Sequence, residues 1–248
     1  MQLKDLRDYN GSLLNISGFR DYCPNGVQVE GRPEVLRIAS GVSASLNMLE
    51  MATEWGADAI IVHHGYFWRN EDASITGIKK RRIAHLLQHN MSLLAYHLPL
   101  DAHPDLGNNV QLAKQLGWQT QGRFAEQDIA SYGAPQEVQT LSQLATQLET
   151  KLDRVPQVIG DLSKTINSIA WCTGGAQGYF EQAIAMGVDV FITGEISEQN
   201  VHVARETGVA FIAAGHHATE RYGVQALGEH LADRFALEHC FFDDVNPV

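Results

Sequence analysis

The feature that most constrains the fold is a block of sequence that occurs twice. GADAIIVHHGYFW, residues 56–68, resembles GVDVFITGEISEQ, residues 187–199, and the blocks align without gaps at an offset of 131 residues. Each block is preceded by an apolar strand pattern, a loop of small residues and an amphipathic helix pattern. A chain that repeats this order is expected to fold into two similar α/β halves with mainly parallel sheets.

A second repeated pair lies downstream in each half, where SLLAYHLPLD matches AFIAAGHHATE. His97 and His216 differ by 119 positions, as do Asp101 and Glu220. Both copies therefore carry a histidine followed four residues later by a carboxylate. The first half holds 12 more residues between its two blocks. Ordered matches of this kind predict an internal duplication.

The alternation of apolar and amphipathic segments predicts the elements of both halves. Strands are expected at residues 36–40, 59–62, 92–96, 168–172, 190–193 and 210–213. Helices are expected at residues 44–55, 81–88, 109–116, 177–186, 199–206 and 218–235. An irregular stretch and the helical pattern LSQLATQLETKL interrupt the repeat. The predicted organisation is a first half over residues 1–118, an inserted segment of the second lobe over 119–164, and a second half over 165–248.

Charge and composition argue against several kinds of function. The chain has 18 Lys and Arg against 29 Asp and Glu, a formal net charge of −11, which disfavours a basic nucleic-acid groove. No apolar run reaches the roughly 18–20 residues of a membrane span. The N-terminal MQLKDLRDYN lacks the apolar stretch of a secretory signal. The three cysteines form no close pair and are expected to be reduced thiols in a cytoplasmic setting.

Histidines and carboxylates collect where the predicted strands end. His63 and His64 follow the strand AIIV, Asp101 comes after the strand SLLAY, and His216 and Glu220 come after FIAAG. The i, i+4 spacing of the last two puts both side chains on one face of a helix. Functional groups of α/β sheets gather beyond the carboxyl ends of the strands. Since imidazole and carboxylate suit divalent ions such as Zn, Fe, Mn or Ni, these five residues predict a two-metal site.

Each of these residues also has a structural interpretation. A single histidine at a strand end is usually a hydrogen-bonded loop residue, so metal ligation is inferred from the clustering and its repetition. His97 is expected beside the site, and Glu195 occupies the position of His64 in the second copy. We take Glu195 and His97 as candidate catalytic residues that accept, donate or orient a proton. The loop TGGAQG could hold an anion on its backbone amides, and no serine or cysteine nucleophile with a paired base is indicated.

Five motifs together give the sequence a specific resemblance. In order, PNGVQVEG, GADAIIVHHGYFW, YHLPLDAHPDLGNN, TGEISEQ and AAGHHATERYG resemble the dinuclear metal-centre hexameric proteins, also described as Nif-three-like, YbgI-like or GTP cyclohydrolase I type 2 homologues. The resemblance implies that His63 and His64 each bind one of two metal ions. It implies further that Asp101 and His216 are ligands and that Glu220 bridges both ions. It also implies a toroidal homohexamer, a trimer of dimers, with the metal sites facing an internal cavity.

Two divalent ions with open coordination positions favour hydrolysis. The resemblance implies a GTP cyclohydrolase I type 2-like, metal-dependent hydrolase that acts on a nucleotide-like or phosphorylated small molecule. Two such ions would attract a small anionic substrate to an acidic protein. The alternative is a non-enzymatic, metal-binding hexameric scaffold or regulator. Neither a nucleic acid nor a membrane is expected as a partner.

Overall fold

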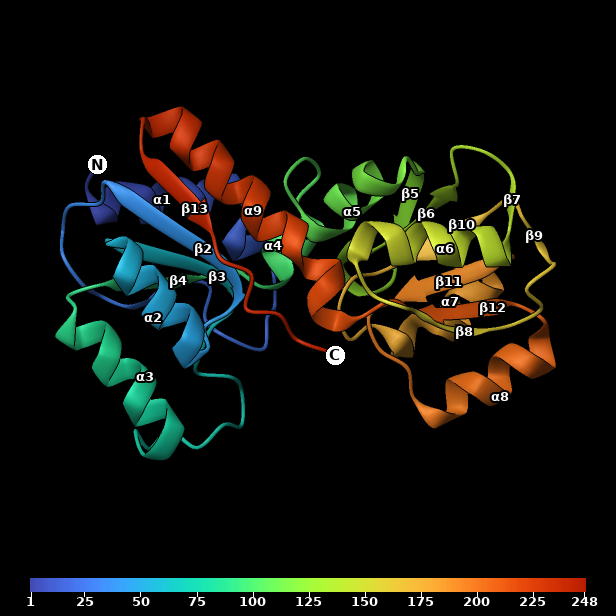
Figure 1. Cartoon of the computed structure of the whole chain (residues 1–248), viewed down its shortest axis with the longest axis horizontal. Coiled ribbons are helices and arrows are strands. Elements are labelled where there is room, and N and C mark those ends of the chain that lie inside the picture. The colour runs from blue at the N-terminus through green and yellow to red at the C-terminus, as the bar shows by residue number, and fades with distance from the viewer. The chain divides into compact units, whose positions relative to one another are not determined.

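A computed structural model describes the whole chain, residues 1–248, which forms two compact units. Unit 1 comprises Met1–Gly107 and Gly223–Val245, and unit 2 comprises Asn108–Tyr222 and Asn246–Val248. Each unit has one main sheet with helices packed on it (Figure 1). Because most strand pairs around the candidate residues are parallel, the expected mainly parallel α/β class is confirmed.

Unit 1 is built on a five-stranded sheet of order β1-β4-β3-β2-β13. Strands β13, β2, β3 and β4 are parallel, and β1 pairs with β4 in the antiparallel sense. Its elements are α1 (Leu3–Leu13), η1 (Ile16–Gly18), β1 (Gly26–Val29), β2 (Arg37–Ser43), α2 (Leu46–Trp55), β3 (Ala59–His64), α3 (Gly77–Gln88), β4 (Ser92–Ala95), α4 (Leu98–Ala102), the part of α9 (His216–Phe235) after Tyr222, and β13 (Glu238–Phe241).

Successive strand residues of unit 1 point into two apolar layers, as the two-residue period of a strand requires. Ile61 packs on one face with Leu6 of α1 and Leu227 of α9. Ile60 packs on the other face with Leu49 of α2. Unit 1 therefore has three layers, with helices on both sides of the sheet.

Unit 2 is built on a six-stranded sheet of order β5-β6-β10-β11-β12-β8. Strands β10, β11 and β12 are parallel, and the remaining neighbours pair antiparallel. Its elements are α5 (Asn108–Leu116), β5 (Gln119–Phe124), η2 (Glu126–Asp128), β6 (Ala130–Ala134), β7 (Gln139–Thr140), α6 (Leu141–Leu152), β8 (Gln157–Ile159), β9 (Thr165–Ile166), β10 (Ile169–Trp171), η3 (Gln177–Tyr179), α7 (Phe180–Ala185), β11 (Val190–Thr193), α8 (Glu198–Thr207), β12 (Ala210–Ala213) and the start of α9.

Residues 119–164 are integrated into the sheet and core of unit 2. Strands β5 and β6 extend the sheet beyond β10, and β8 extends it beyond β12. Helix α6 coincides with the expected helical pattern, and its Leu144 packs with Trp171 and Ile192. Phe191 contacts Phe180 of α7 on the opposite face. Unit 2 is therefore also covered by helices on both sides.

The two units differ from the expected ranges at two boundaries. Residues 108–118 lie in unit 2 because Leu112 and Leu116 of α5 pack with α6 in one core. Residues 223–245 lie in unit 1 because β13 pairs with β2. This pairing begins at Glu238, which lies opposite Arg37. In both places, packing against a distant segment decides where the chain belongs.

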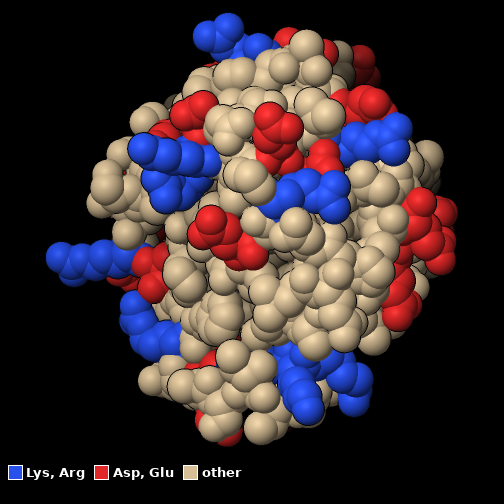
Figure 2. All heavy atoms as spheres, turned by 90° about the vertical axis from the view of Figure 1, so that its left-hand side faces the viewer, with Lys and Arg blue, Asp and Glu red and all other residues tan.

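The structure has no helix with the length and hydropathy of a membrane span, and its longest helix, α9, has 20 residues. On the face of unit 1 shown in Figure 2, Lys and Arg are interspersed with Asp and Glu. No continuous basic stripe of the kind that binds nucleic acid lies on that face.

Candidate functional site

The ends of β3 and β4 place three histidines together in unit 1. His63 and His64 are the last two residues of β3, and His97 follows β4 as the residue before α4. One ring nitrogen from each of the three lies within 4.8 Å of the others. Adjacent parallel strands end at the same edge of a sheet, which is why these distant parts of the sequence meet.

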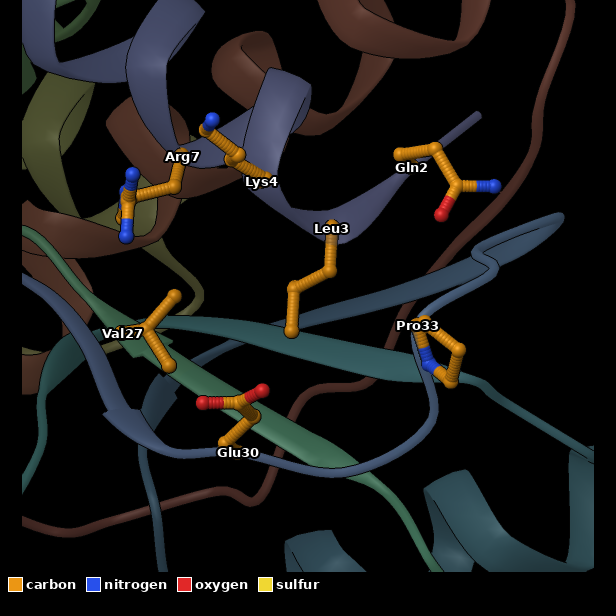
Figure 3. Close-up of a pocket in the computed structure, with 7 residues that line it drawn as sticks. All are labelled: Gln2, Leu3, Lys4, Arg7, Val27, Glu30 and Pro33. Atoms are coloured by element: carbon orange, nitrogen blue, oxygen red, sulfur yellow. The ribbon is translucent and has the colours of Figure 1, made fainter.

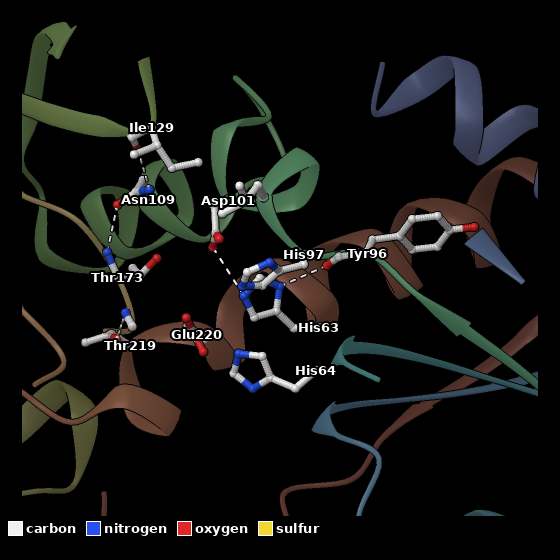
Figure 4. Close-up of polar contacts among 12 residues, drawn as sticks. His63, His64, Tyr96, His97, Asp101, Asn109, Ile129, Thr173, Thr219 and Glu220 are labelled. Atoms are coloured by element: carbon white, nitrogen blue, oxygen red, sulfur yellow. Dashed lines mark hydrogen bonds and ion pairs between the residues drawn. The ribbon is translucent and has the colours of Figure 1, made fainter. Parts of the chain in front are cut away.

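His63 is fully buried, and contacts at both ring nitrogens fix its orientation (Figure 4). Its Nδ1 lies 2.9 Å from the carbonyl oxygen of Tyr96, and its Nε2 lies 3.5 Å from Oδ1 of Asp101. Because a carbonyl can only accept, Nδ1 carries a hydrogen, and Nε2 is the ring atom directed at the carboxylate. A fixed Nδ1–H with Nε2 directed at a carboxylate is the arrangement of a metal-ligating histidine.

His64 is oriented by the neighbouring strand. Its Nδ1 lies 3.1 Å from Oγ of Ser43, at the end of β2. The rings of His63 and His64 are tilted against each other with centroids 4.6 Å apart. The two rings thus come from one strand end and are oriented through different neighbours.

His97 is held by a carboxylate that the sequence analysis did not identify. Its Nδ1 donates to Oδ1 of Asp21 at 2.7 Å, and the other oxygen of Asp21 accepts the backbone N–H of Leu98 at 3.0 Å. Burial raises the pKa of Asp21, but the hydrogen bond and charge of His97, with a further hydrogen bond from Asn25, lower it below its usual value. Asp21 is therefore a carboxylate, and it directs Nε2 of His97 away from itself.

Cys23 lies beside this pair, and one ligand atom each from Asp21, Cys23 and His97 lies within 4.8 Å of the others. Burial and the negative charge of Asp21 raise the pKa of the Cys23 thiol to about 12. Since only a thiolate is a strong ligand or nucleophile, Cys23 without a metal ion is a protonated thiol at neutral pH.

The corresponding strand ends of unit 2 bring together one histidine and two carboxylates. Glu195 follows β11, and His216 is the first residue of α9, after β12. Nδ1 of His216 donates to Oε1 of Glu195 at 2.7 Å, and Nε2 lies 3.2 Å from Oε2 of Glu220. The expected i, i+4 placement of His216 and Glu220 on one helix face is confirmed.

The two carboxylates raise the pKa of His216. Burial lowers the pKa of His216, but the hydrogen bonds and negative charges of Glu220 and then Glu195 raise it to about 9. Without a metal, the ring is therefore an imidazolium between two carboxylates at neutral pH. The donor set suits a divalent cation in place of that proton.

The loop after β10 makes room for Glu220. Gly174 has a φ of +72°, and a Cβ at this position would lie 2.0 Å from Oε1 of Glu220. Three backbone amides of the loop already donate to side chains: Thr173 to Asn109, Gly174 to Thr219 and Ala176 to Thr193. The expectation that TGGAQG holds an anion is therefore wrong for these three amides, and the loop instead accommodates the Glu220 carboxylate.

Unit 1 also has a small cavity between α1 and the segment around β1. Figure 3 shows Lys4 and Arg7 on one side of it, Glu30 on the other and Leu3 and Val27 between them. The cavity has a volume of about 150 Å³ and is lined by Gln2, Leu3, Lys4, Arg7, Val27, Glu30 and Pro33. It contains no histidine or cysteine, so its lining offers no metal-ligand cluster.

One pair of side chains was not indicated by the sequence. Oγ of Ser40 on β2 lies 2.8 Å from Nε2 of His239 on β13. Ser40 is fully buried, and burial lowers the pKa of His239 below its usual value. Because a nucleophilic serine must reach its substrate, this pair is a hydrogen bond within the sheet rather than a catalytic dyad.

Comparisons with known proteins identify the family of the chain. The chain matches the family described as Duf34/NIF3 (NGG1p interacting factor 3) over residues 1–247. The chain belongs to the Duf34/NIF3 family. A relative from Pseudomonas aeruginosa, named GTP cyclohydrolase 1 type 2 homolog, is 55% identical over 238 residues, covering 95% of this chain and 94% of the relative. A relative of the same name from Neisseria meningitidis serogroup B is 52% identical over 245 residues, covering 99% and 98%.

Two solved structures have the same fold as this chain. The structure described as protein ybgI, of unknown function, has a TM-score of 0.97 at 45% identity, with 100% of both chains covered. The crystal structure of TTHA1606 from Thermus thermophilus has a TM-score of 0.90 at 34% identity, again with 100% of both chains covered. The family to which the five sequence motifs pointed is thereby confirmed.

Proposed function

We propose that this Duf34/NIF3 protein is a metal-dependent hydrolase that binds two divalent ions. The proposed ligands are His63, His64 and Asp101 of unit 1 with His216 and Glu220 of unit 2, and Glu220 is proposed to bridge the ions. The observation that carries the proposal is shared by His63 and His216. In each, Nδ1 is fixed by a protein acceptor and Nε2 lies beside a carboxylate, at 3.5 Å and 3.2 Å respectively.

The donor set fits two ions of borderline or hard character, such as Zn, Fe, Mn or Ni. If bound there, two such ions would supply the Lewis-acid chemistry of a hydrolase. Five protein ligands leave coordination positions open, as catalytic rather than structural sites do.

Glu195 and His97 are the proposed proton carriers. Oε1 of Glu195 orients His216, while Oε2 accepts a hydrogen bond from Gln177 at 3.2 Å. The side chain of Glu195 is partly exposed, so a proton can reach it from solvent. His97 has its Nδ1 engaged by Asp21, which leaves Nε2 as the atom that accepts or donates a proton.

The name of the relatives, GTP cyclohydrolase 1 type 2 homolog, supports a nucleotide-like or phosphorylated small molecule as substrate. A cyclohydrolase reaction would require attack of water on the imidazole ring of a purine nucleotide. The resemblance also supports a cytoplasmic, toroidal homohexamer arranged as a trimer of dimers, which sedimentation analysis of the purified protein would test.

Metal content and turnover measured on the same samples test the proposal. Protein purified without chelators is expected to carry two divalent ions per chain by mass spectrometry. Asp101→Ala and Glu220→Ala are expected to lose most of this metal and all turnover. His202→Ala, which changes an exposed histidine of α8, is the matched control and should retain both.

The alternative function, a metal-binding scaffold or regulator, predicts a different outcome. Asp101→Ala would then lower metal content and assembly stability, but the metal-loaded wild type would turn over no member of a broad nucleotide and phosphoester panel. That result, obtained with each of the four candidate metals, would contradict the hydrolase proposal.

A further inference from the structure

A second cavity opens in unit 2 beside the loops that carry Glu195 and His216. It has a volume of about 330 Å³, and its lining includes Gly194 and Glu195 after β11, Ala213 at the end of β12, Pro247, and Arg154 after α6. The candidate catalytic carboxylate of Glu195 and the guanidinium of Arg154 therefore line the same cavity.

Arg154 has donors that the protein does not use. Its Nη1 donates to the carbonyl oxygen of Pro247, but its Nε is buried and has no hydrogen-bond partner. The ion pairs of the structure do not include Arg154. Its Nη2 has no acceptor in the structure and is not buried, and Arg154 lines the cavity, so an anion that enters the cavity can accept hydrogen bonds from this charged group.

Glu195 is not the anionic partner of the Arg154 guanidinium. Its Oε1 accepts from His216 at 2.7 Å, its Oε2 accepts from Gln177 at 3.2 Å, and it forms no ion pair with Arg154. Glu195 is the one acidic side chain in the cavity lining, and both of its carboxylate oxygens are thus engaged by other residues.

Arg154 lies against the backbone that leads into the candidate ligand His216. A Cβ at Gly215, whose φ is +103°, would lie 2.5 Å from Nε of Arg154. Gly215 is therefore needed for the guanidinium to occupy this place. An anion held by Arg154 would be positioned next to the His216 loop rather than at a remote surface.

We infer that this cavity binds the phosphate group of a small-molecule substrate and that Arg154 recognises it. The inference rests on the proposed function, because it assigns the reacting part of that substrate to the side of Glu195 and His216. The planar guanidinium can donate two parallel N–H groups to phosphate oxygens, which a lysine ammonium cannot reproduce. The site therefore selects phosphorylated molecules over their neutral counterparts.

Guanosine monophosphate and guanosine test the inference, because the two probes differ only in the phosphate. Dissociation constants are measured by calorimetry with metal-loaded protein and again with chelator-treated protein, since phosphates also bind metal ions. Wild type is expected to bind the monophosphate more tightly in both forms. Arg154→Ala should weaken the monophosphate about tenfold or more and leave guanosine unchanged.

Two further variants separate charge, geometry and folding. Arg154→Lys keeps the charge without the planar fork and is expected to fall between wild type and Arg154→Ala. Arg205→Ala removes an exposed positive charge from α8 of the same unit and should have no effect. Thermal unfolding and metal analysis of each variant exclude loss of fold or metal as the cause.

The possible failures are distinguishable. Three results would each overturn the phosphate site. Wild type could bind the two probes with equal affinity, or bind neither. Alternatively, folded Arg154→Ala could bind the monophosphate as tightly as wild type does. If wild type carried metal and hydrolysed phosphorylated compounds regardless, the proposed function would stand. If Arg154-dependent phosphate binding persisted in a protein without metal or turnover, only the hydrolase proposal would fall.

Discussion

The two units share one sheet plan and carry different side chains at the same edge. The parallel strands β2, β3 and β4 of unit 1 and β10, β11 and β12 of unit 2 have the same order. In each unit an antiparallel strand from earlier in the chain pairs with the third of them, β1 with β4 and β8 with β12. The units differ beyond the first strand, where β13 is parallel to β2 and β6 is antiparallel to β10. The shared strands are the ones that end at the candidate residues.

An aspartate before the second shared strand has the same role in both units. Asp58 and Asp189 each accept two backbone N–H groups from the segment that leads into the first shared strand. The donors are Leu36 and Arg37 for Asp58, and Asn167 and Ser168 for Asp189, at 2.8–3.0 Å. This local repeat supports the duplication that the sequence predicts.

The units diverge where the chemistry is expected. The histidine after the third shared strand has its Nδ1 held by a carboxylate at 2.7 Å in both units. That carboxylate is Asp21, before β1, in unit 1 and Glu195, after β11, in unit 2. Because Asp21 supplies the carboxylate in unit 1, the position equivalent to Glu195 is available for His64. The comparison teaches that two units with one sheet plan can carry different side chains at equivalent strand ends when a different loop supplies the orienting carboxylate.

Of the variants that test this comparison, Gly174→Ala is expected to have the largest effect on metal affinity. It acts on Glu220, a carboxylate of unit 2, and on no candidate residue of unit 1. The new Cβ would lie 2.0 Å from Oε1 of Glu220, at a backbone φ of +72°. We expect metal affinity to fall more than about 100-fold, together with some loss of stability. Metal titration of chelator-treated protein measures the effect. Gly178→Ala, where a Cβ would meet nothing within 4 Å, is the control, and equal affinities in both variants would mean that Glu220 binds no metal from this position.

Glu195→Gln and Asp21→Asn compare the two orienting carboxylates directly. Glu195→Gln should lower metal affinity about 10- to 100-fold, because His216 is a proposed ligand and loses a charged acceptor. Asp21→Asn should leave metal affinity within about threefold and lower kcat, because His97 is proposed to move protons rather than bind metal. An equal loss of metal affinity in the two variants would instead make His97 a ligand.

Asp189→Asn and Asp58→Asn should have the smallest effects, about 1–3 kcal/mol of unfolding free energy each. Burial raises the pKa of Asp189, but hydrogen bonds from Asn167 and Ser168 and the charge of Lys164 lower it below its usual value. The stabilisation by Asp189 is therefore complete above pH of about 4 and is lost as the pH falls through the lowered folded pKa.

The measurement is the unfolding temperature of wild type and Asp189→Asn as a function of pH. The difference between them should shrink below pH of about 4, while Asp233→Asn, an exposed change, should match wild type throughout. A difference that persists unchanged into acid would show that the stabilisation does not depend on the charge of Asp189.

Local signals in the sequence determined the shared strands and most of the candidate ligands. The strands expected at residues 190–193 and 210–213 coincide with β11 and β12, and the helix expected over 218–235 begins two residues earlier. These predictions succeed because strand and helix periods, and the i, i+4 pair of His216 and Glu220, depend on residues close together in the chain. The repeat then pointed to the strand ends as the place of the chemistry.

Tertiary structure alone decided which distant groups serve those strand ends. Strands β1, β13 and β8 owe their positions to pairing with remote partners, and the sequence pattern did not predict them. Asp21 reaches His97 across 76 residues, and Arg154 reaches Pro247 across 93. No periodicity encodes such contacts, because they depend on how the folded elements of one unit pack. The sequence thus determined the candidate ligand types and their spacing, and the tertiary fold determined which groups orient them.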